Sequence, residues 1–354
     1  MKKLTAGWLI LLVAVPVLGA EPANHAGTFS IVAYDPMMEE WGVAVQSKFL
    51  AVGSAVPFAR AGVGAVATQA MGNTAYGPEA LALMALGVPV EQVIGVVTGK
   101  DAQRDFRQVG VVDGAGHVAA WTGSSCSAWA GHVTGLNFSV QGNILTGEEV
   151  IQAMAASFET SQGPLGVRLI KALQAGQGAG GDSRGRQSAA LLVVRRGGGY
   201  GGNDDRFIDL RVDDNPEPIV ELERLYGLHE TFFQGASYVR SGREFMAAGK
   251  HAAAERAFSF AIRIAERNMT EPYLLNAVAW ELALADMRLD KALRFAAAAV
   301  VLAPDNANIW DTLGEVYARQ GEFKKAVAAA AKAVALEPES TEFAARLETW
   351  KKAR

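Results

Sequence analysis

A repeat in the last third of the chain restricts the fold more than any other feature. Pro304 and Pro338 lie 34 residues apart, and Ala299 recurs as Ala333 at the same spacing. Small residues at fixed positions let two helices approach closely, and a proline ends the second helix of each pair. The sequence therefore predicts stacked helix pairs, and no sheet, over this part of the chain.

The copy that contains Trp310, Gly314 and Gly321 resembles a tetratricopeptide repeat (TPR), and so does the copy before it. A weaker third copy begins near Gly235. We expect about three repeats over residues 235–354, the usual minimum for a stable stack. An unrelated Ala-rich helical bundle is the alternative. Stacked tetratricopeptide repeats imply a concave groove for a protein or peptide partner.

Composition separates this region from the rest of the chain. Most of the 38 glycines come before Gly235, and this shift marks a domain boundary within 354 residues, a length sufficient for two domains. The net charge of −4 provides no basic field for nucleic acid.

The N-terminus has the pattern of an export signal. Lys2 and Lys3 precede a short apolar run, and small residues precede Glu21. We expect a signal peptide over residues 1–20, a short pro-segment over 21–27, and a periplasmic or secreted protein. An uncleaved anchor is the alternative, although the run is shorter than a usual membrane span.

Apolar strands and amphipathic helices alternate in residues 28–234 and predict an α+β domain. Two groups of strands separated by helix pairs favour two sheets with helices outside, a four-layer αββα sandwich. The expected strands cover residues 28–34, 41–47, 62–70, a hairpin over 107–123, 137–144, 186–196 and 206–214, and the expected helices cover 76–87, 89–99, 147–160, 164–176 and 219–234.

Thr28 is the candidate nucleophile. It follows the small residue Gly27 at the start of the first strand. A threonine hydroxyl needs a base, and one known arrangement uses the residue's own α-amine after cleavage of the preceding bond. That amine titrates near ~7.7–8.0 when free, and a nearby cation lowers its pKa. Lys48 or Arg60 is the expected cation.

Several segments resemble an uncharacterised bacterial family, the domain of unknown function 1028. They include "TFSIVAYDP", "GVAVQSKFLAVGSAVPFARAGVGAVATQA", "AAWTGSSCSAWAGH", "QGNIL" and "GDSRGRQSAALLVVRRGGGYGG". The family is placed in the N-terminal-nucleophile (Ntn) hydrolase superfamily, so the resemblance implies the αββα fold, self-cleavage and amide hydrolysis. It matches Thr28 to the nucleophile and Arg60, or alternatively Lys48, to the basic residue. Gln46-Ser47 replaces the superfamily's usual acidic partner.

Loop residues supply the remaining candidates. Polar residues that follow predicted strands are candidates for oxyanion or substrate contacts, namely Gly123, Ser124, Ser125 and Asn143. Asp182, Arg184 and Arg186 either bind a charged substrate or, as we favour, pair internally.

The proposed activity is cleavage of a small-molecule or peptide amide, without cofactor or metal. The alternative function is an inactive ligand-binding scaffold that acts through its repeats. A third reading uses Cys126, the only cysteine, as nucleophile with His132 nearby. Association of the chain into a homo-oligomer is a further expectation that the sequence leaves open.

Overall fold

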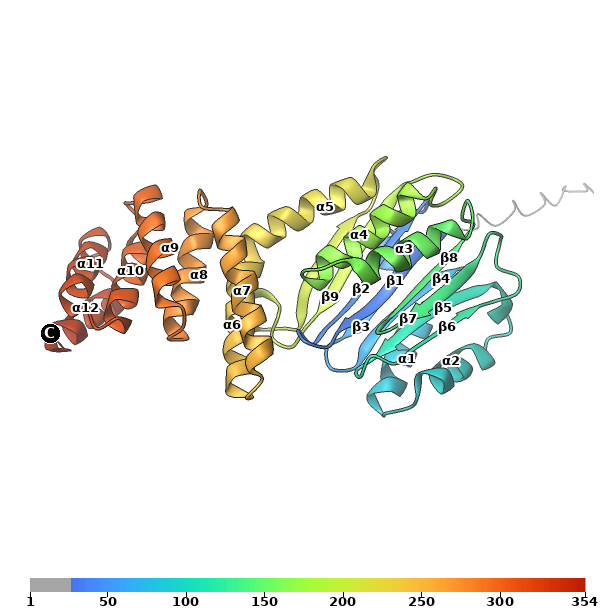
Figure 1. Ribbon diagram of the computed structural model, residues 1–354, viewed down its shortest axis with the longest axis horizontal. Helices are drawn as coiled ribbons and strands as arrows, with labels where there is room; N and C mark the ends of the chain where they lie inside the picture. The colour runs from blue at the N-terminus through green and yellow to red at the C-terminus, as the bar shows by residue number, and fades with distance from the viewer. Residues whose placement is uncertain (1–26, 354) are drawn as a thin grey trace, which may run out of the picture.

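The computed structural model describes residues 27–353, so the predicted signal peptide and all of the pro-segment except Gly27 lie outside the described residues. Figure 1 shows a mixed α/β domain with two sheets, followed by a row of helices that extends away from it. This arrangement confirms the expected division into an α/β part and a helical repeat part.

The larger sheet contains the first strand at its centre. All of its neighbouring strands are antiparallel. Its order is β10 (Arg206–Val212), β9 (Ser188–Val194), β2 (Glu40–Ser47), β1 (Thr28–Asp35), β8 (Phe138–Asn143) and β7 (Gly131–Gly135).

The smaller sheet packs against the larger one. Its order is β3 (Pro57–Arg60), β4 (Gly64–Ala70), β5 (Arg107–Asp113) and β6 (Val118–Thr122). The sequence pattern missed β3 and β7. Both are short edge strands, and β3 begins with proline while β7 begins and ends with glycine, residues that weaken a strand signal.

Helices cover the outer face of each sheet (Figure 1). On the six-stranded sheet lie α3 (Glu149–Thr160) and α4 (Leu165–Gly178), and on the four-stranded sheet lie α1 (Tyr76–Ala85) and α2 (Val90–Gly99). Short 3₁₀ turns occupy Val52–Ser54, Arg104–Phe106 and Tyr200–Gly202. The layers are therefore helix, sheet, sheet and helix.

Alternation along β1 assigns its side chains to two environments. Phe29 and Ile31 join the core under α3 and α4, whereas Val32 joins the apolar core between the sheets. Because successive strand residues point to opposite faces, Thr28 and Ser30 also face the second sheet. At this end of β1 the layer between the sheets is polar.

Two buried glutamines from the smaller sheet join the sheets at this end. Gln69 accepts a 2.6 Å hydrogen bond from Ser30 Oγ and donates to Gln108 Oε1 at 2.8 Å. Gln108 donates to the backbone oxygen of Gly142 at 2.8 Å, and Gln141 donates to Ser30 at 2.6 Å. The amides of Gln69, Gln108 and Gln141 thus all have partners, as a stable polar layer requires.

Three antiparallel helix pairs and a final helix form the repeat region. The pairs are α6 (Gly235–Ala247) with α7 (His251–Arg267), α8 (Pro272–Leu284) with α9 (Leu289–Leu302), and α10 (Ala307–Arg319) with α11 (Phe323–Leu336). The last helix, α12 (Thr341–Ala353), covers the end of the stack with Phe343 and Trp350 buried.

The two parts of the chain share a continuous helical connection. Helix α5 (Pro218–His229) passes through a π-helical turn, Glu230–Gln234, into α6. The predicted boundary after residue 234 falls inside this connection. Arg195 stabilises the junction, because it forms a buried 2.6 Å ion pair with Glu40 and donates to Ser237 Oγ of α6 at 2.8 Å.

Among residues 27–353, no helix combines the length and apolar character that crossing a membrane requires.

Replacing Gln69 with leucine tests the polar layer. We expect Gln69→Leu to lower the free energy of unfolding by about 3 kcal/mol, because Ser30 and the Thr28 carbonyl lose their buried partner. Denaturant titration measures the change. The exposed Gln152→Leu in α3 is the control and should change stability little; equal effects of the two would contradict this role for the layer.

His229, at the end of α5, should make stability depend on pH. Burial lowers its pKa to about 4, and Nδ1 accepts from Gln234 Nε2 at 3.1 Å only when deprotonated. The neutral form therefore stabilises the fold above pH 6.5, and this contribution is lost as pH falls towards 4.

We expect unfolding free energy to fall less between pH 6.5 and 4 in His229→Gln than in the wild type. Denaturant titrations at several pH values measure the difference. The exposed His251→Gln is the control and should keep the wild-type dependence. Parallel curves for wild type and His229→Gln would show that His229 does not contribute.

Candidate functional site

Thr28 lies between two neighbouring strands at the start of β1. Its backbone is opposite Ser47 of β2 and Asn143 of β8. The residue is only 2% exposed, and its nitrogen is the amide of the Gly27–Thr28 peptide bond. Thr28 is therefore held in a defined position at one end of the layer between the sheets.

A chain of hydroxyl groups connects Thr28 with the carbonyl before it. Ser47 Oγ lies 3.0 Å from Thr28 Oγ1 and donates to the Gly27 oxygen at 2.5 Å. A carbonyl oxygen can only accept, so the single Ser47 proton points to Gly27. The Thr28 hydroxyl consequently donates to Ser47.

A guanidinium group also reaches the Gly27 carbonyl. Arg184 Nη2 donates to the Gly27 oxygen at 2.9 Å and pairs with Asp182 Oδ2 at 2.8 Å. The Asp182 carboxylate is fully buried and accepts further bonds from the backbone of Lys48 and Arg184. The Gly27 oxygen thus has two donors, one of them cationic.

The loop after α4 brings these charged residues to β1. Thr146 N donates to the Gly181 oxygen, and Ser183 N donates to the Ile144 oxygen, so the loop continues the edge of β8. Asp182 then packs against Gly27, where an added Cβ would lie 2.7 Å from Asp182 Oδ1. Only glycine fits here without moving the carboxylate.

Lys48 and Arg186 lie near this cluster, but their charged groups turn away from Gly27. The exposed Lys48 ammonium donates to the Arg186 oxygen at 3.3 Å, and Arg186 forms an ion pair with Glu217. Asp182, Arg184 and Arg186 therefore take part in ion pairs within the chain, as expected from sequence, and Arg184 is the cation that contacts the Gly27 carbonyl.

The structure does not bring Arg60 to Thr28, so the position expected for it is wrong. Arg60 is exposed at the end of β3, where it pairs with Gly64 at the start of β4. Gln69, which contacts Thr28, lies five residues further along β4. At about 3.3 Å per residue this separation is roughly 17 Å. Because β3 runs antiparallel to β4, its last residue lies at the opposite end of the sandwich.

Asn143 and the loop after β6 differ in their relation to Thr28. Asn143 is buried opposite Thr28 and donates to Gln108 Oε1 at 3.1 Å, so it belongs to the polar layer. Ser124 and Ser125 are exposed, and the backbone of Gly123 and Ser125 bonds to Arg107 and Asp105. Ser125 and Asn143 line one small pocket with Cys126.

Cys126 and His132 do not form a catalytic pair. The Cys126 thiol donates to the Arg107 oxygen at 3.4 Å, and burial raises its pKa, which disfavours the thiolate. His132 Nδ1 lies 2.9 Å from Thr122 Oγ1 instead. The arrangement gives no support to Cys126 as nucleophile.

The described part of the chain contains no group of three or more His, Cys, Asp or Glu side chains placed to hold a metal. Around the Gly27 carbonyl the structure places the hydroxyls of Thr28 and Ser47, the Arg184 guanidinium and the Asp182 carboxylate. Sequence reasoning did not assign a role to Ser47. Its place at the end of β2, opposite the start of β1, could have indicated one.

The comparisons with known proteins give different matches for the α/β part and for the helical repeat part of the chain. The model of a family of unknown function, DUF1028, matches residues 28–222, and a tetratricopeptide repeat model matches residues 307–340. No curated protein is significantly similar to the chain.

Solved structures give matches to each part. Protein SPO2555 from Silicibacter pomeroyi, a DUF1028 structure, matches with 35% identity and a TM-score of 0.54, over 58% of this chain and 87% of that one. The first TPR domain of human RPAP3 matches with 17% identity and a TM-score of 0.26, over 34% of this chain and 91% of that one.

MamA from Desulfovibrio magneticus RS-1 matches with 19% identity and a TM-score of 0.25, over 38% of this chain and 79% of that one. The DUF1028 model covers more than half of the 354 residues, and SPO2555 shares more than 30% identity over most of its own length. The chain therefore belongs to the DUF1028 family and carries tetratricopeptide repeats after its family domain.

Proposed function

We propose that this protein is an exported amidohydrolase of the N-terminal-nucleophile type, with Thr28 as its nucleophile after cleavage of the Gly27–Thr28 bond. The observation that carries the proposal is the pair of donors, Ser47 and Arg184, on the Gly27 carbonyl next to the Thr28 hydroxyl. The two-sheet layering and the leader pattern are consistent with it.

The first step is self-cleavage. Thr28 Oγ1 attacks the Gly27 carbonyl carbon, the C–O bond forms, and negative charge develops on the Gly27 oxygen. Ser47 Oγ and the Arg184 guanidinium already donate to this oxygen, so they stabilise the charge without rearrangement. The C–N bond then breaks, and water hydrolyses the resulting ester to leave a Gly27 carboxylate and a free Thr28 amine.

Ser47 also provides a path for the proton. The Thr28 hydroxyl donates to Ser47, so its proton can pass to Ser47 Oγ during the attack while Ser47 passes its own proton to the Gly27 oxygen. When the Gly27 carbonyl forms again and the C–N bond breaks, that proton moves to the leaving nitrogen of Thr28. This role requires a hydroxyl, which explains how serine can stand where the superfamily usually has an acidic residue.

After cleavage the same groups act on a substrate. The free Thr28 amine becomes the general base, and the neighbouring Arg184 cation favours its neutral form. The scissile carbonyl oxygen of the substrate takes the place of the Gly27 oxygen, between Arg184 and Ser47. The Asp182 carboxylate leaves little space beside this position, which favours an acyl group without a branched α-carbon.

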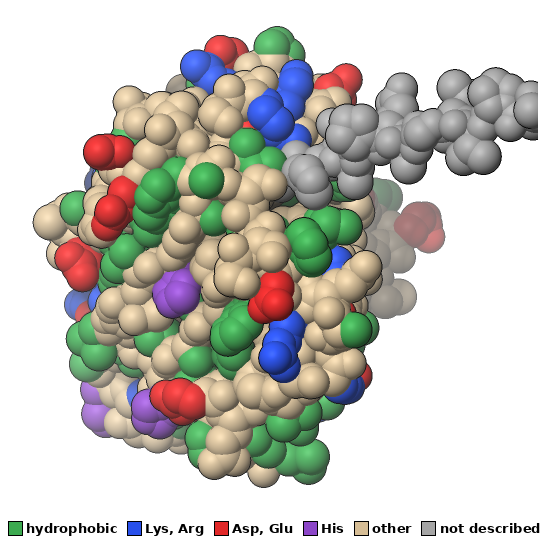
Figure 2. Space-filling model, turned by 90° about the vertical axis from the view of Figure 1, so that its right-hand side faces the viewer, with side chains coloured by type: hydrophobic (Ala, Val, Ile, Leu, Met, Phe, Trp, Pro, Cys, Tyr) green, Lys and Arg blue, Asp and Glu red, His purple; other side chains and the backbone are tan. Residues whose placement is uncertain are grey.

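The surface at this end of the domain is mostly uncharged. Figure 2 shows the end that faces away from the repeats, where uncharged side chains and backbone make up most of the face and several basic side chains gather in its upper part. Small peptides or related amides are therefore the proposed substrates. The repeats would bind a protein or peptide partner.

One observation favours the alternative function, a ligand-binding scaffold without hydrolysis. With Gly27 in place, Thr28 is only 2% exposed, so an uncut chain gives substrate no access to the hydroxyl. The two functions differ in whether the Gly27–Thr28 bond is cleaved.

Removal of the hydroxyls tests the proposal directly. In the full chain produced with export, we expect wild type and Thr28→Ser to begin at residue 28 and Thr28→Ala to keep Gly27. We expect Ser47→Ala to slow cleavage about a hundredfold, because the oxyanion loses one donor. Intact mass and N-terminal sequencing measure the cut.

Ser183→Ala is the matched control, since this exposed hydroxyl of the same loop donates to the Ile144 oxygen. It should be cleaved like the wild type. A wild-type protein that still carries residues before Thr28 would exclude the mechanism and leave the scaffold.

Enlarging the residue before the cut should also slow cleavage. The Cβ of Gly27→Ala would lie 2.7 Å from Asp182 Oδ1 and displace Asp182 together with its partner Arg184. We expect slower cleavage in a time course followed by intact mass. Gly178→Ala, with open space around its Cβ, is the control; cleavage of Gly27→Ala at the wild-type rate would show that the fit around Gly27 is not required.

A further inference from the structure

A cavity lies between the two parts of the chain and far from Thr28. It measures about 690 Å³ and is lined by α4 with the loop before it, by the π-helical turn and by α7. It adjoins Asp35, because Arg256 from its lining donates to this residue at the far end of β1. Seven residues along a strand separate Asp35 from Thr28 by about 23 Å, so the cavity is a separate site.

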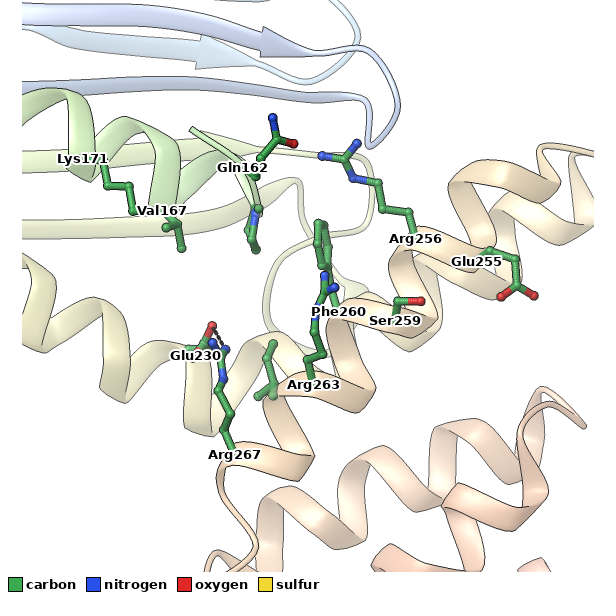
Figure 3. A pocket seen from close by; sticks show the side chains of 13 residues that line it. Gln162, Val167, Lys171, Glu230, Glu255, Arg256, Ser259, Phe260, Arg263 and Arg267 are labelled. Atoms are coloured by element: carbon green, nitrogen blue, oxygen red, sulfur yellow. Dashed lines mark hydrogen bonds and ion pairs between the residues drawn. The ribbon is translucent and has the colours of Figure 1, made fainter. Parts of the chain in front are cut away.

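Four cationic and two acidic side chains line the cavity (Figure 3). Most of them are paired within the protein. Arg267 pairs with Glu230 at 2.8 Å, Arg256 pairs with Asp35 at 3.3 Å, and Glu255 pairs with Arg288. These pairs hold the walls in place and use up both acidic groups of the lining.

Two cations remain without an acidic partner among residues 27–353. They are Lys171 of α4 and Arg263 of α7, one from each part of the chain. The Arg263 guanidinium carbon lies 4.9 Å from the centre of the Phe260 ring, which limits its freedom and turns it towards the cavity wall (Figure 3). Val167, Phe260 and Ile264 add apolar surface between the cations.

We infer that this cavity binds a ligand with two carboxylates joined by an apolar portion. Each carboxylate would pair with one of the two free cations, and the apolar portion would lie against Phe260 and Val167. The ion pair between an exposed cation and a carboxylate is strongest when a concave, partly apolar site holds the carboxylate in place. The chemistry is that of a free dicarboxylate or of a peptide ending in an acidic residue, and the inference does not depend on cleavage at Thr28.

Calorimetric titration of the full chain tests the inference. The probes are acetyl-Ala-Leu-Glu, which has two carboxylates, the same peptide amidated at its C-terminus, the neutral acetyl-Ala-Leu-Gln amide, and glutarate. We expect the two-carboxylate peptide or glutarate to bind more tightly than the amidated and neutral peptides, and binding to weaken with added NaCl. Tight binding of glutarate identifies a free dicarboxylate, whereas tight binding of the peptide alone identifies a peptide end.

Three variants locate the binding. We expect Lys171→Gln and Arg263→Gln each to weaken the affinity at least tenfold. Lys332→Gln, an exposed lysine of α11 outside the cavity, should leave it unchanged. Circular dichroism checks that all three variants fold. Equal affinity for charged and neutral probes, or wild-type affinity in both cavity variants, would overturn the inference.

Discussion

The hydrogen bonds of Gln69 and Gln108 determine how the two sheets meet at the end where β1 begins. An apolar contact there would close the layer by packing alone, but buried amides must find particular partners, because an unpaired amide is costly. The partners of these amides lie on β1, β5 and β8, so the hydrogen bonds fix how the two sheets align. Thr28 lies at the end of this layer and takes its position from it.

The candidate site is built on this rigid end by a loop and a neighbouring strand. β2 places Ser47 opposite Thr28, and the loop after α4 places Arg184 over the Gly27 carbonyl. A strand fixes the hydroxyl pair closely, and the buried Asp182 holds the guanidinium. A peptide carbonyl with two such donors beside a hydroxyl is arranged for attack, which is why the proposed chemistry centres on this bond.

The repeats are attached to the domain with a defined geometry. The continuous helix through the π-helical turn and the buried Arg195–Glu40 pair connect them, and breaking such a pair leaves an unpaired buried charge. The junction thereby creates a cavity that neither part contains alone. A ligand bound there would touch both parts, and its binding would couple to their relative position.

The sequence by itself determined most of the elements: the period of 34 residues gave helix pairs, the alternation of residues gave the central strands, and Gly27-Thr28 at a strand start gave the candidate nucleophile. These are local properties of spacing and conformational preference. Only the tertiary structure decided which cation meets the Gly27 carbonyl, because the loop after α4 brings Arg184 there, whereas β3 places Arg60, the cation expected from sequence, at the opposite end of the sandwich. The same holds for the short edge strands and for the cavity between the two parts, because both depend on contacts between residues far apart in sequence.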